Sequence, residues 1–187
     1  MSQVWPQVLN DPIVGATASL LLVAVLGGAS WHKLLDRIAF RETLRDYQIL
    51  PEAAIGPVAT IVPLVELVAC ILLAVPGTRA IGASVATGLL AGYAIAIGLN
   101  LARGRTDIDC GCSWGGGTQP ISTWLIGRNA LLIAIAAVAA TPWSARTLGL
   151  IDGLVILAAA SFAFLIYHAA DRLIANQALL SAMQRSR

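Results

Sequence analysis

Charged residues are scarce in this chain. They make up 12% of its 187 residues, whereas 58% are hydrophobic, and a soluble domain carries about a quarter charged residues. The shortage excludes an ordinary soluble domain and predicts a protein whose solvent is the lipid bilayer. The net charge of +2 is too small to favour a nucleic-acid partner, and three cysteines are too few for a secreted fold held by disulfides.

The first eleven residues contain neither lysine nor arginine. A cleavable signal peptide begins with a positively charged segment, which this stretch lacks. We therefore expect the first apolar stretch to stay in the protein as a membrane anchor.

Five apolar stretches are each long enough to cross a bilayer, because a hydrocarbon core of about 30 Å needs about 20 helical residues. Lipid offers no partner to backbone polar groups, so we expect helices rather than strands. The predicted fold is an all-α integral membrane protein, a five-transmembrane-helix bundle that forms one membrane domain over residues 1–187. Its predicted spans are 13–31, 53–75, 80–102, 121–140 and 149–170.

Two connecting segments differ from the tight turns elsewhere. In the segment 36–50, arginines recur at every fourth position and apolar side chains fall on another face. This pattern predicts an amphipathic helix that lies in the membrane interface after the first span, and Pro51 should end it. The stretch 103–120, called the dithiol loop below, is the longest polar loop and carries Cys110-Gly111-Cys112.

The two cysteines of this loop are the most reactive side chains in the chain. Gly111 permits the bend that would let Cys110 and Cys112 form a small disulfide ring, and strained rings are easily reduced. A redox-active pair is therefore predicted. Two alternatives stay open: loop cysteines without chemistry, or a zinc or copper site completed by His32 and His168. No local metal-ligand spacing supports the metal site, so we expect none.

The residues around the pair predict an accessible loop. The run Gly115-Gly116-Gly117 favours flexibility, and Ser122 is the expected N-cap of the next helix. The positive end of that helix would favour a thiolate, whereas Asp107 and Asp109 would oppose it. The sequence therefore does not decide the ionisation state of the thiols.

Two charged residues lie inside apolar spans, where an unpaired charge is costly. Glu66 and Arg128 lie on the second and fourth spans, at depths that predict an ion pair, and Asn129 could add a hydrogen bond. Such a pair would lock two helices together or form a proton or ligand site near the dithiol. Cys70, one turn beyond Glu66, is expected to pack in the core.

The side of the membrane on which the dithiol loop lies follows from basic residues. Five crossings place it on the same side as the segment 33–52 and the C-terminal tail. The positive-inside rule predicts that this side is cytoplasmic, where thiols are normally kept reduced. The other side has two arginines, whereas this side has nine basic residues: Lys33, Arg37, Arg41, Arg45, Arg103, Arg105, Arg172, Arg185 and Arg187.

Several motifs carry a resemblance to known membrane families over about residues 15–170. One set resembles the DoxX-like family: Lys33-Leu34-Leu35-Asp36, Phe40, Leu50-Pro51, Glu66 and Gly77-Thr78-Arg79. A more specific set resembles the MauE family of methylamine utilisation: Asp109-Cys110-Gly111-Cys112, Pro120-Ile121-Ser122 and Arg128-Asn129.

The resemblance to the MauE family implies a membrane accessory protein for the maturation of periplasmic methylamine dehydrogenase. The protein would support disulfide formation in the small subunit of that enzyme. Cys110 and Cys112 would form a thiol–disulfide relay with a MauD-like thioredoxin-fold protein, supported by Arg128, Asn129 and Glu66. The dithiol loop would then face the periplasm from the bacterial inner membrane, contrary to the arginine count.

Two other functions stay open. A non-catalytic scaffold that docks the partner would tolerate serine at both cysteines. A DoxX-type binder of quinone or another small ligand would need Glu66 and Arg128 more than the thiols. Quinone is the one cofactor that the resemblance suggests.

Overall fold

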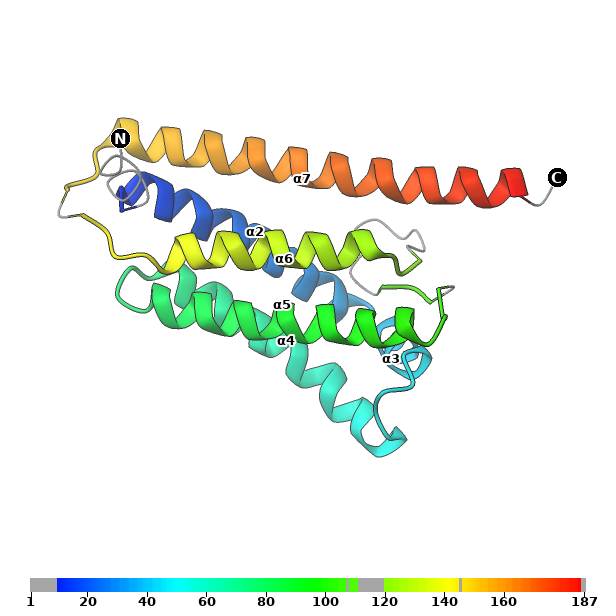
Figure 1. Ribbon diagram of the computed structural model, residues 1–187. Coiled ribbons are helices and arrows are strands. Elements are labelled where there is room, and N and C mark those ends of the chain that lie inside the picture. The colour runs from blue at the N-terminus through cyan, green and yellow to red at the C-terminus, as the bar shows by residue number, and fades with distance from the viewer. Residues whose placement is uncertain (1–9, 107, 111–119, 145, 186–187) are drawn as a thin grey trace.

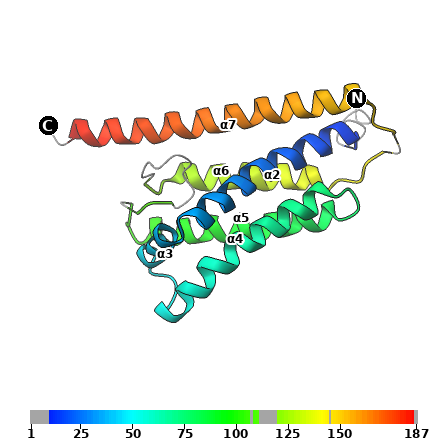
Figure 2. The ribbon, with the colours of Figure 1, turned by 180° about the vertical axis from the view of Figure 1, so that it is seen from behind.

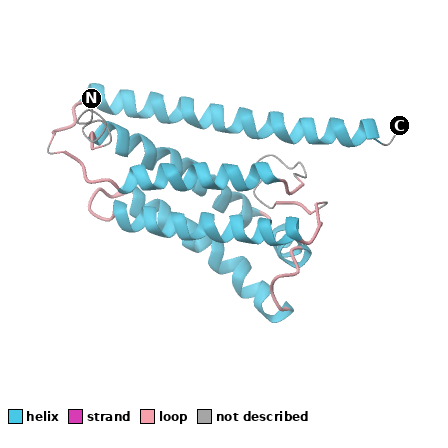
Figure 3. Cartoon of the chain, in the orientation of Figure 1, coloured by secondary structure: helices cyan, strands magenta, loops and turns pink. Residues whose placement is uncertain are grey.

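The computed structural model describes residues 10–106, 108–110, 120–144 and 146–185. This part of the chain is helical, and the one strand-like feature in it is an isolated bridge (Figure 3). Its helices lie side by side in an elongated bundle (Figure 1). In chain order they are α2 Pro12–Leu35, α3 Arg37–Asp46, α4 Glu52–Ala74, α5 Arg79–Ala102, α6 Thr123–Ala140 and α7 Leu150–Arg185.

Five of these helices, α2, α4, α5, α6 and α7, are long and apolar enough to cross a membrane. The predicted all-α membrane fold with five spans is thereby confirmed. Most helix ends fall close to the predicted ones, but α7 is 36 residues long and continues to Arg185. The predicted end at residue 170 follows the loss of hydropathy, whereas the next residues are good helix formers without glycine or proline.

The bundle has two distinct ends, seen from both sides in Figures 1 and 2. The end called the dithiol end holds α3, the described residues of the dithiol loop and the C-terminal part of α7. The opposite end holds the start of α2, the turn between α4 and α5, and the link between α6 and α7. This grouping is the one that five crossings predict.

Helix α3 has the amphipathic character predicted for an interfacial helix. The Asp36 side chain accepts a hydrogen bond from the Ala39 N–H at 2.9 Å, which caps the start of the helix. Phe40 is buried against the bundle, while Arg37 and Arg41 on other faces are exposed. The chain then leaves α3 through Gln48, whose φ is +47°.

Helices α2 and α4 are joined by a buried polar contact as well as by apolar packing. The Ser30 hydroxyl donates to the Pro63 carbonyl oxygen at 2.8 Å. Cys70 lies in the apolar core formed by α2, α4, α5 and α6, as expected for a packing cysteine.

The opposite end is held by an arginine that caps a helix. Arg79 donates to the carbonyl oxygens of Ala139 and Thr141 at the C-terminal end of α6, whose last carbonyls have no partner within the helix. Its guanidinium lies over the Trp143 ring, 3.8 Å from the centroid. The same indole packs so closely on Gly15 of α2 that a Cβ there would lie 2.1 Å from Nε1.

Candidate functional site

Cys110 lies at the mouth of the bundle between α5 and α6. It is 6% exposed and packs in an apolar cluster with Ile97 of α5 and Leu125 of α6. The expectation of an accessible loop is therefore wrong for Cys110. Gly111, Cys112 and the glycine run 115–117 lie outside the described residues.

The base of the dithiol loop is closed by backbone pairing. The Ile121 N–H donates to the Ile108 carbonyl oxygen at 3.0 Å, and Asp109 forms an antiparallel bridge with Pro120. Ile108 and Ile121 are both buried beside Cys110, which explains why the cysteine faces the interior. Ser122 is the N-cap residue of α6, as predicted, but its side chain makes no capping hydrogen bond.

An apolar cavity of about 80 Å³, called the thiol cavity below, lies next to Cys110. Its walls come from α3, α4, α5 and the end of α2, so the interfacial helix forms one side of it. Among the described residues that line it, one is charged, a lysine. The lining residues are Lys33, Phe40, Thr43, Leu44, Tyr47, Val62, Tyr93, Ala96, Ile97 and Cys110.

A cluster of three polar side chains borders the thiol cavity: Lys33 and Glu66 are buried, and Tyr93 is partly buried. Lys33 Nζ lies 2.5 Å from Glu66 Oε1, and the Tyr93 hydroxyl donates to the same oxygen at 2.7 Å. Lys33 Nζ also donates to the Tyr93 hydroxyl at 3.1 Å. The side chains of Lys33 and Glu66 are 1% and 0% exposed, so this Lys33–Glu66–Tyr93 cluster is withdrawn from solvent.

Sequence reasoning missed Lys33 because it treated this residue as a charge of the segment after the first span. Helix α2 continues to Leu35, and Lys33 is one of its buried residues. A signal was present: Leu22, Leu26, Ser30 and Lys33 follow helical spacing and are all buried. Lys33 is thus an interior partner of Glu66 and drops out of the count of surface charges.

The predicted ion pair between Glu66 and Arg128 is wrong. Glu66 pairs with Lys33, whereas Arg128 Nη1 lies 3.0 Å from Asp171 Oδ1. The reason is the length of α7, because the helix carries Asp171 past the predicted end of the span to the level of Arg128. The Trp124 indole N–H also donates to Asp171, at 3.4 Å.

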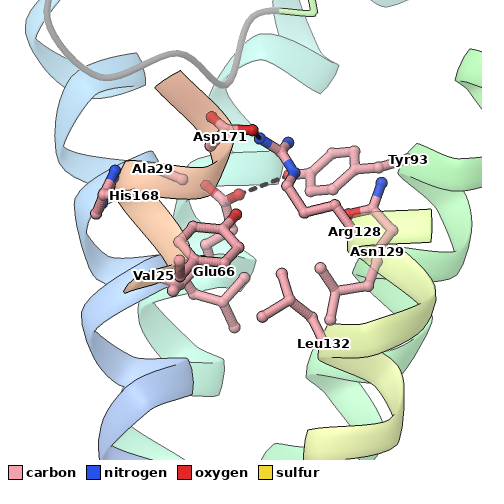
Figure 4. Close-up of a pocket in the computed structure, with 12 residues that line it drawn as sticks. Val25, Ala29, Glu66, Tyr93, Arg128, Asn129, Leu132, His168 and Asp171 are labelled. Carbon is pink, nitrogen blue, oxygen red and sulfur yellow. Dashed lines mark hydrogen bonds and ion pairs between the residues drawn. The ribbon is translucent and has the colours of Figure 1, made fainter. Parts of the chain in front are cut away.

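The predicted supporting residues nevertheless meet around one small cavity, called the polar cavity below (Figure 4). Its volume is about 30 Å³, enough for one or two waters, since one water needs about 10–15 Å³. Glu66 Oε2 and Asn129 Nδ2 are buried and have no hydrogen-bond partner within the part of the chain that the structure describes. The polar residues that line it are Glu66, Tyr93, Arg128, Asn129, Tyr167, His168 and Asp171.

The structure also bears on the two histidines. His168 lies inside α7 rather than at its end, where it packs edge-on against Phe164 and Tyr167. His32 lies in the last turn of α2. Among the described residues, no three His, Cys, Asp or Glu side chains converge as a metal site would require, and Cys112 lies outside that set.

The site has a buried thiol on one side of the apolar thiol cavity and the Lys33–Glu66–Tyr93 cluster on the other. Lys33 and Tyr93 line the thiol cavity together with Cys110, and Glu66 and Tyr93 line the polar cavity. The cluster therefore forms the wall between the two cavities. Such an arrangement can move a proton between the thiol and the cluster while the thiol stays out of bulk water.

Comparison with known proteins places most of this chain in one family. The family model described as "Methylamine utilisation protein MauE" matches residues 11–142. The methylamine utilization protein MauE of Methylophilus methylotrophus is 37% identical over 172 residues, which cover 89% of this chain and 88% of that protein. That of Paracoccus denitrificans is 35% identical over 166 residues, covering 88% of this chain and 89% of that protein. No solved structure matches this chain. The chain therefore belongs to the MauE family of methylamine utilisation proteins.

Proposed function

We propose that this multi-pass membrane protein is a thiol–disulfide relay of methylamine utilisation, with Cys110 and Cys112 as its redox pair. The observation that carries the proposal is the placement of Cys110. It is held at the helix mouth, beside an apolar cavity that it shares with the buried Lys33 and Tyr93. Two cysteines one residue apart suit electron exchange rather than stapling, because a small ring is strained.

The client is the small subunit of methylamine dehydrogenase, and the direct partner is a MauD-like thioredoxin-fold protein. Family membership supports the link to methylamine utilisation, and the resemblance set out above supplies the partner. The relay then works at the periplasmic face of the bacterial inner membrane, where disulfides persist.

In the proposed reaction, a thiolate of the reduced partner attacks the Cys110–Cys112 disulfide and forms a mixed disulfide. The second thiol of the partner displaces the relay cysteine, so the partner becomes a disulfide and loses two electrons and two protons. The relay gains them as two thiols. The oxidised partner passes its disulfide to the client, and the relay needs an oxidant to return to its starting state.

The burial of Cys110 suggests an order for the two cysteines. A partner thiol cannot reach a sulfur that is 6% exposed without rearrangement of the mouth. We therefore assign partner exchange to Cys112, and Cys110 is the internal cysteine that leaves as a thiolate when the partner attacks Cys112.

Single-cysteine variants test the relay and the order together. Cys110→Ser, combined with serine at the second cysteine of the thioredoxin-fold partner, should accumulate a mixed disulfide with that partner, seen by non-reducing electrophoresis and mass spectrometry. Cys112→Ser should trap far less, and both should abolish client maturation. Cys70→Ser is the matched control, because Cys70 packs in the core away from the mouth, and it should mature the client normally.

The same variants separate the relay from a scaffold without chemistry. A scaffold matures the client when serine replaces both Cys110 and Cys112, and that result would exclude the relay. It fails instead when exposed residues of α3, such as Arg37 and Arg41, are replaced.

A second candidate function, reduction of a quinone, is favoured by the apolar thiol cavity. Tyr93 and Lys33 would offer hydrogen-bond donors to a quinone carbonyl, and the dithiol would become a disulfide while the quinone becomes a quinol. The cavity of about 80 Å³ is smaller than the roughly 150 Å³ that takes up a benzene ring, so α3 must move outward. Quinol formation by the reduced, purified protein, lost in Cys110→Ser, is the test.

A further inference from the structure

The Lys33–Glu66–Tyr93 cluster needs an explanation beyond holding helices together. A buried ion pair usually stabilises a fold no better than apolar side chains of similar volume. Ionisable groups inside a membrane span are expensive and mark functional sites. Lys33, Glu66 and Tyr93 come from three helices, α2, α4 and α5, and meet between two cavities.

We propose that this cluster is the proton-exchange site of the dithiol, with Glu66 receiving the proton that Cys110 gives up and Lys33 stabilising the resulting thiolate. The inference deepens the proposed relay and rests on it. It assigns Lys33 and Tyr93 a part that family membership does not describe.

Hydrogen bonds define the path from Lys33 to Glu66, and the first step, from Cys110 to Lys33, crosses the cavity that both residues line. Lys33 faces the thiol cavity together with Cys110 and donates to the Tyr93 hydroxyl, which in turn donates to Glu66 Oε1. Transfer of one proton along each link converts the Cys110 thiol, the ammonium and the carboxylate into a thiolate, an ammonium and a carboxylic acid. One S–H bond breaks and one O–H bond forms, so the summed charge of the groups stays zero.

Glu66 is suited to be the acceptor because its two oxygens differ. Oε1 accepts from Lys33 and Tyr93, whereas Oε2 is buried without a hydrogen-bond partner among the residues described. The path through Tyr93 delivers the proton to Oε1, and Glu66 also lines the polar cavity on its other side. A neutral overall transfer also avoids creating net charge in a buried site, where such charge is costly.

Other titratable groups surround the cluster, and they define what a test must keep constant. The Arg128–Asp171 pair and His168 border the polar cavity on the far side of Glu66. The groups that face the cluster from all packed elements are Cys70 on α4, Tyr47 at the end of α3, Arg128 on α6, and Tyr167, His168 and Asp171 on α7.

The test is the pH dependence of Cys110 alkylation by a small methanethiosulfonate. The reagent converts the Cys110 thiolate into a mixed disulfide and releases a sulfinate, so the measured rate is that of disulfide formation. The protein carries serine at Cys70 and Cys112, and the conditions are those where the rate is proportional to reagent concentration. With an internal acceptor, thiolate formation releases no proton to water, so the rate should be flat between about pH 6 and 8. In the added Lys33→Met/Glu66→Gln double variant, the proton must leave to water, and the rate should rise about tenfold per pH unit.

The double variant leaves no buried unpaired charge, which keeps it folded. Ser30→Ala is the matched control, since it removes a buried α2–α4 hydrogen bond but no titratable group, and it should keep the flat profile. A tenfold rise per pH unit in the parent protein, or a flat profile in the folded double variant, overturns the inference. Client maturation by Cys110→Ser overturns the relay instead, so the two failures are distinguishable.

Discussion

Charge is used in different ways at the two ends of the bundle. At the opposite end, Arg79 donates to backbone carbonyls, and Arg146 forms exposed ion pairs with Asp11 and Asp152. At the dithiol end, Lys33 pairs with Glu66 in the interior and Arg128 pairs with Asp171, around cavities. The first end uses one guanidinium to cap a helix terminus and another to form ion pairs at the surface. The second holds acids and bases away from water beside a thiol, as proton chemistry requires.

The largest effect should follow from breaking the buried pair on one side only. Glu66→Leu leaves the Lys33 ammonium without its counter-ion, and such a break costs about 3–5 kcal/mol. The Lys33→Met/Glu66→Leu double variant should recover most of this loss. Denaturant unfolding in detergent micelles measures both; equal destabilisation by the single and double variants would contradict the burial of this pair.

A smaller effect is expected from crowding the opposite end. In Gly15→Ala the new methyl would lie 2.1 Å from Trp143 Nε1, so the indole must move off Arg79, at a cost of about 1–3 kcal/mol. Gly27→Ala on the same helix is the control, because its Cβ would meet only Cys70 Sγ at 3.8 Å. The free energies of unfolding of the two variants are compared in the same micelles. Equal values would contradict this packing.

The smallest effect should follow from removing an exposed pair. Arg146 is 43% exposed, and surface salt bridges contribute about 0–1 kcal/mol. Arg146→Ala should therefore change the midpoint of unfolding little, and less still at high salt. A loss comparable with that of Glu66→Leu would erase the difference between the two ends.

The fold was predictable because lipid leaves few choices. Backbone groups in a bilayer must pair within a helix, so the length of each apolar stretch gives the spans, and the spacing of Arg37, Arg41 and Arg45 gives the amphipathic character of α3. Hydropathy does not report where a helix ends once it leaves the apolar layer. For that reason the extension of α7, and with it Asp171, was missed.

The site was predictable in its residues and less so in its pairing. Glu66, Arg128 and Asn129 do surround one cavity, as charges inside spans suggest. Their partners depend on helix rotation, which places Lys33 on the buried stripe of α2 and Asp171 beside α6. The burial of Cys110 depends on the pairing of Ile108 with Ile121. The sequence of a glycine-rich loop does not predict this contact.

Differential alkylation and mass spectrometry on native membranes test the central proposal most directly. With the partner and client present, Cys110 and Cys112 should interconvert between a disulfide and two thiols as the redox conditions change, while Cys70 stays reduced throughout. A pair that stays fully reduced under every condition, in cells that still mature methylamine dehydrogenase, would contradict the relay.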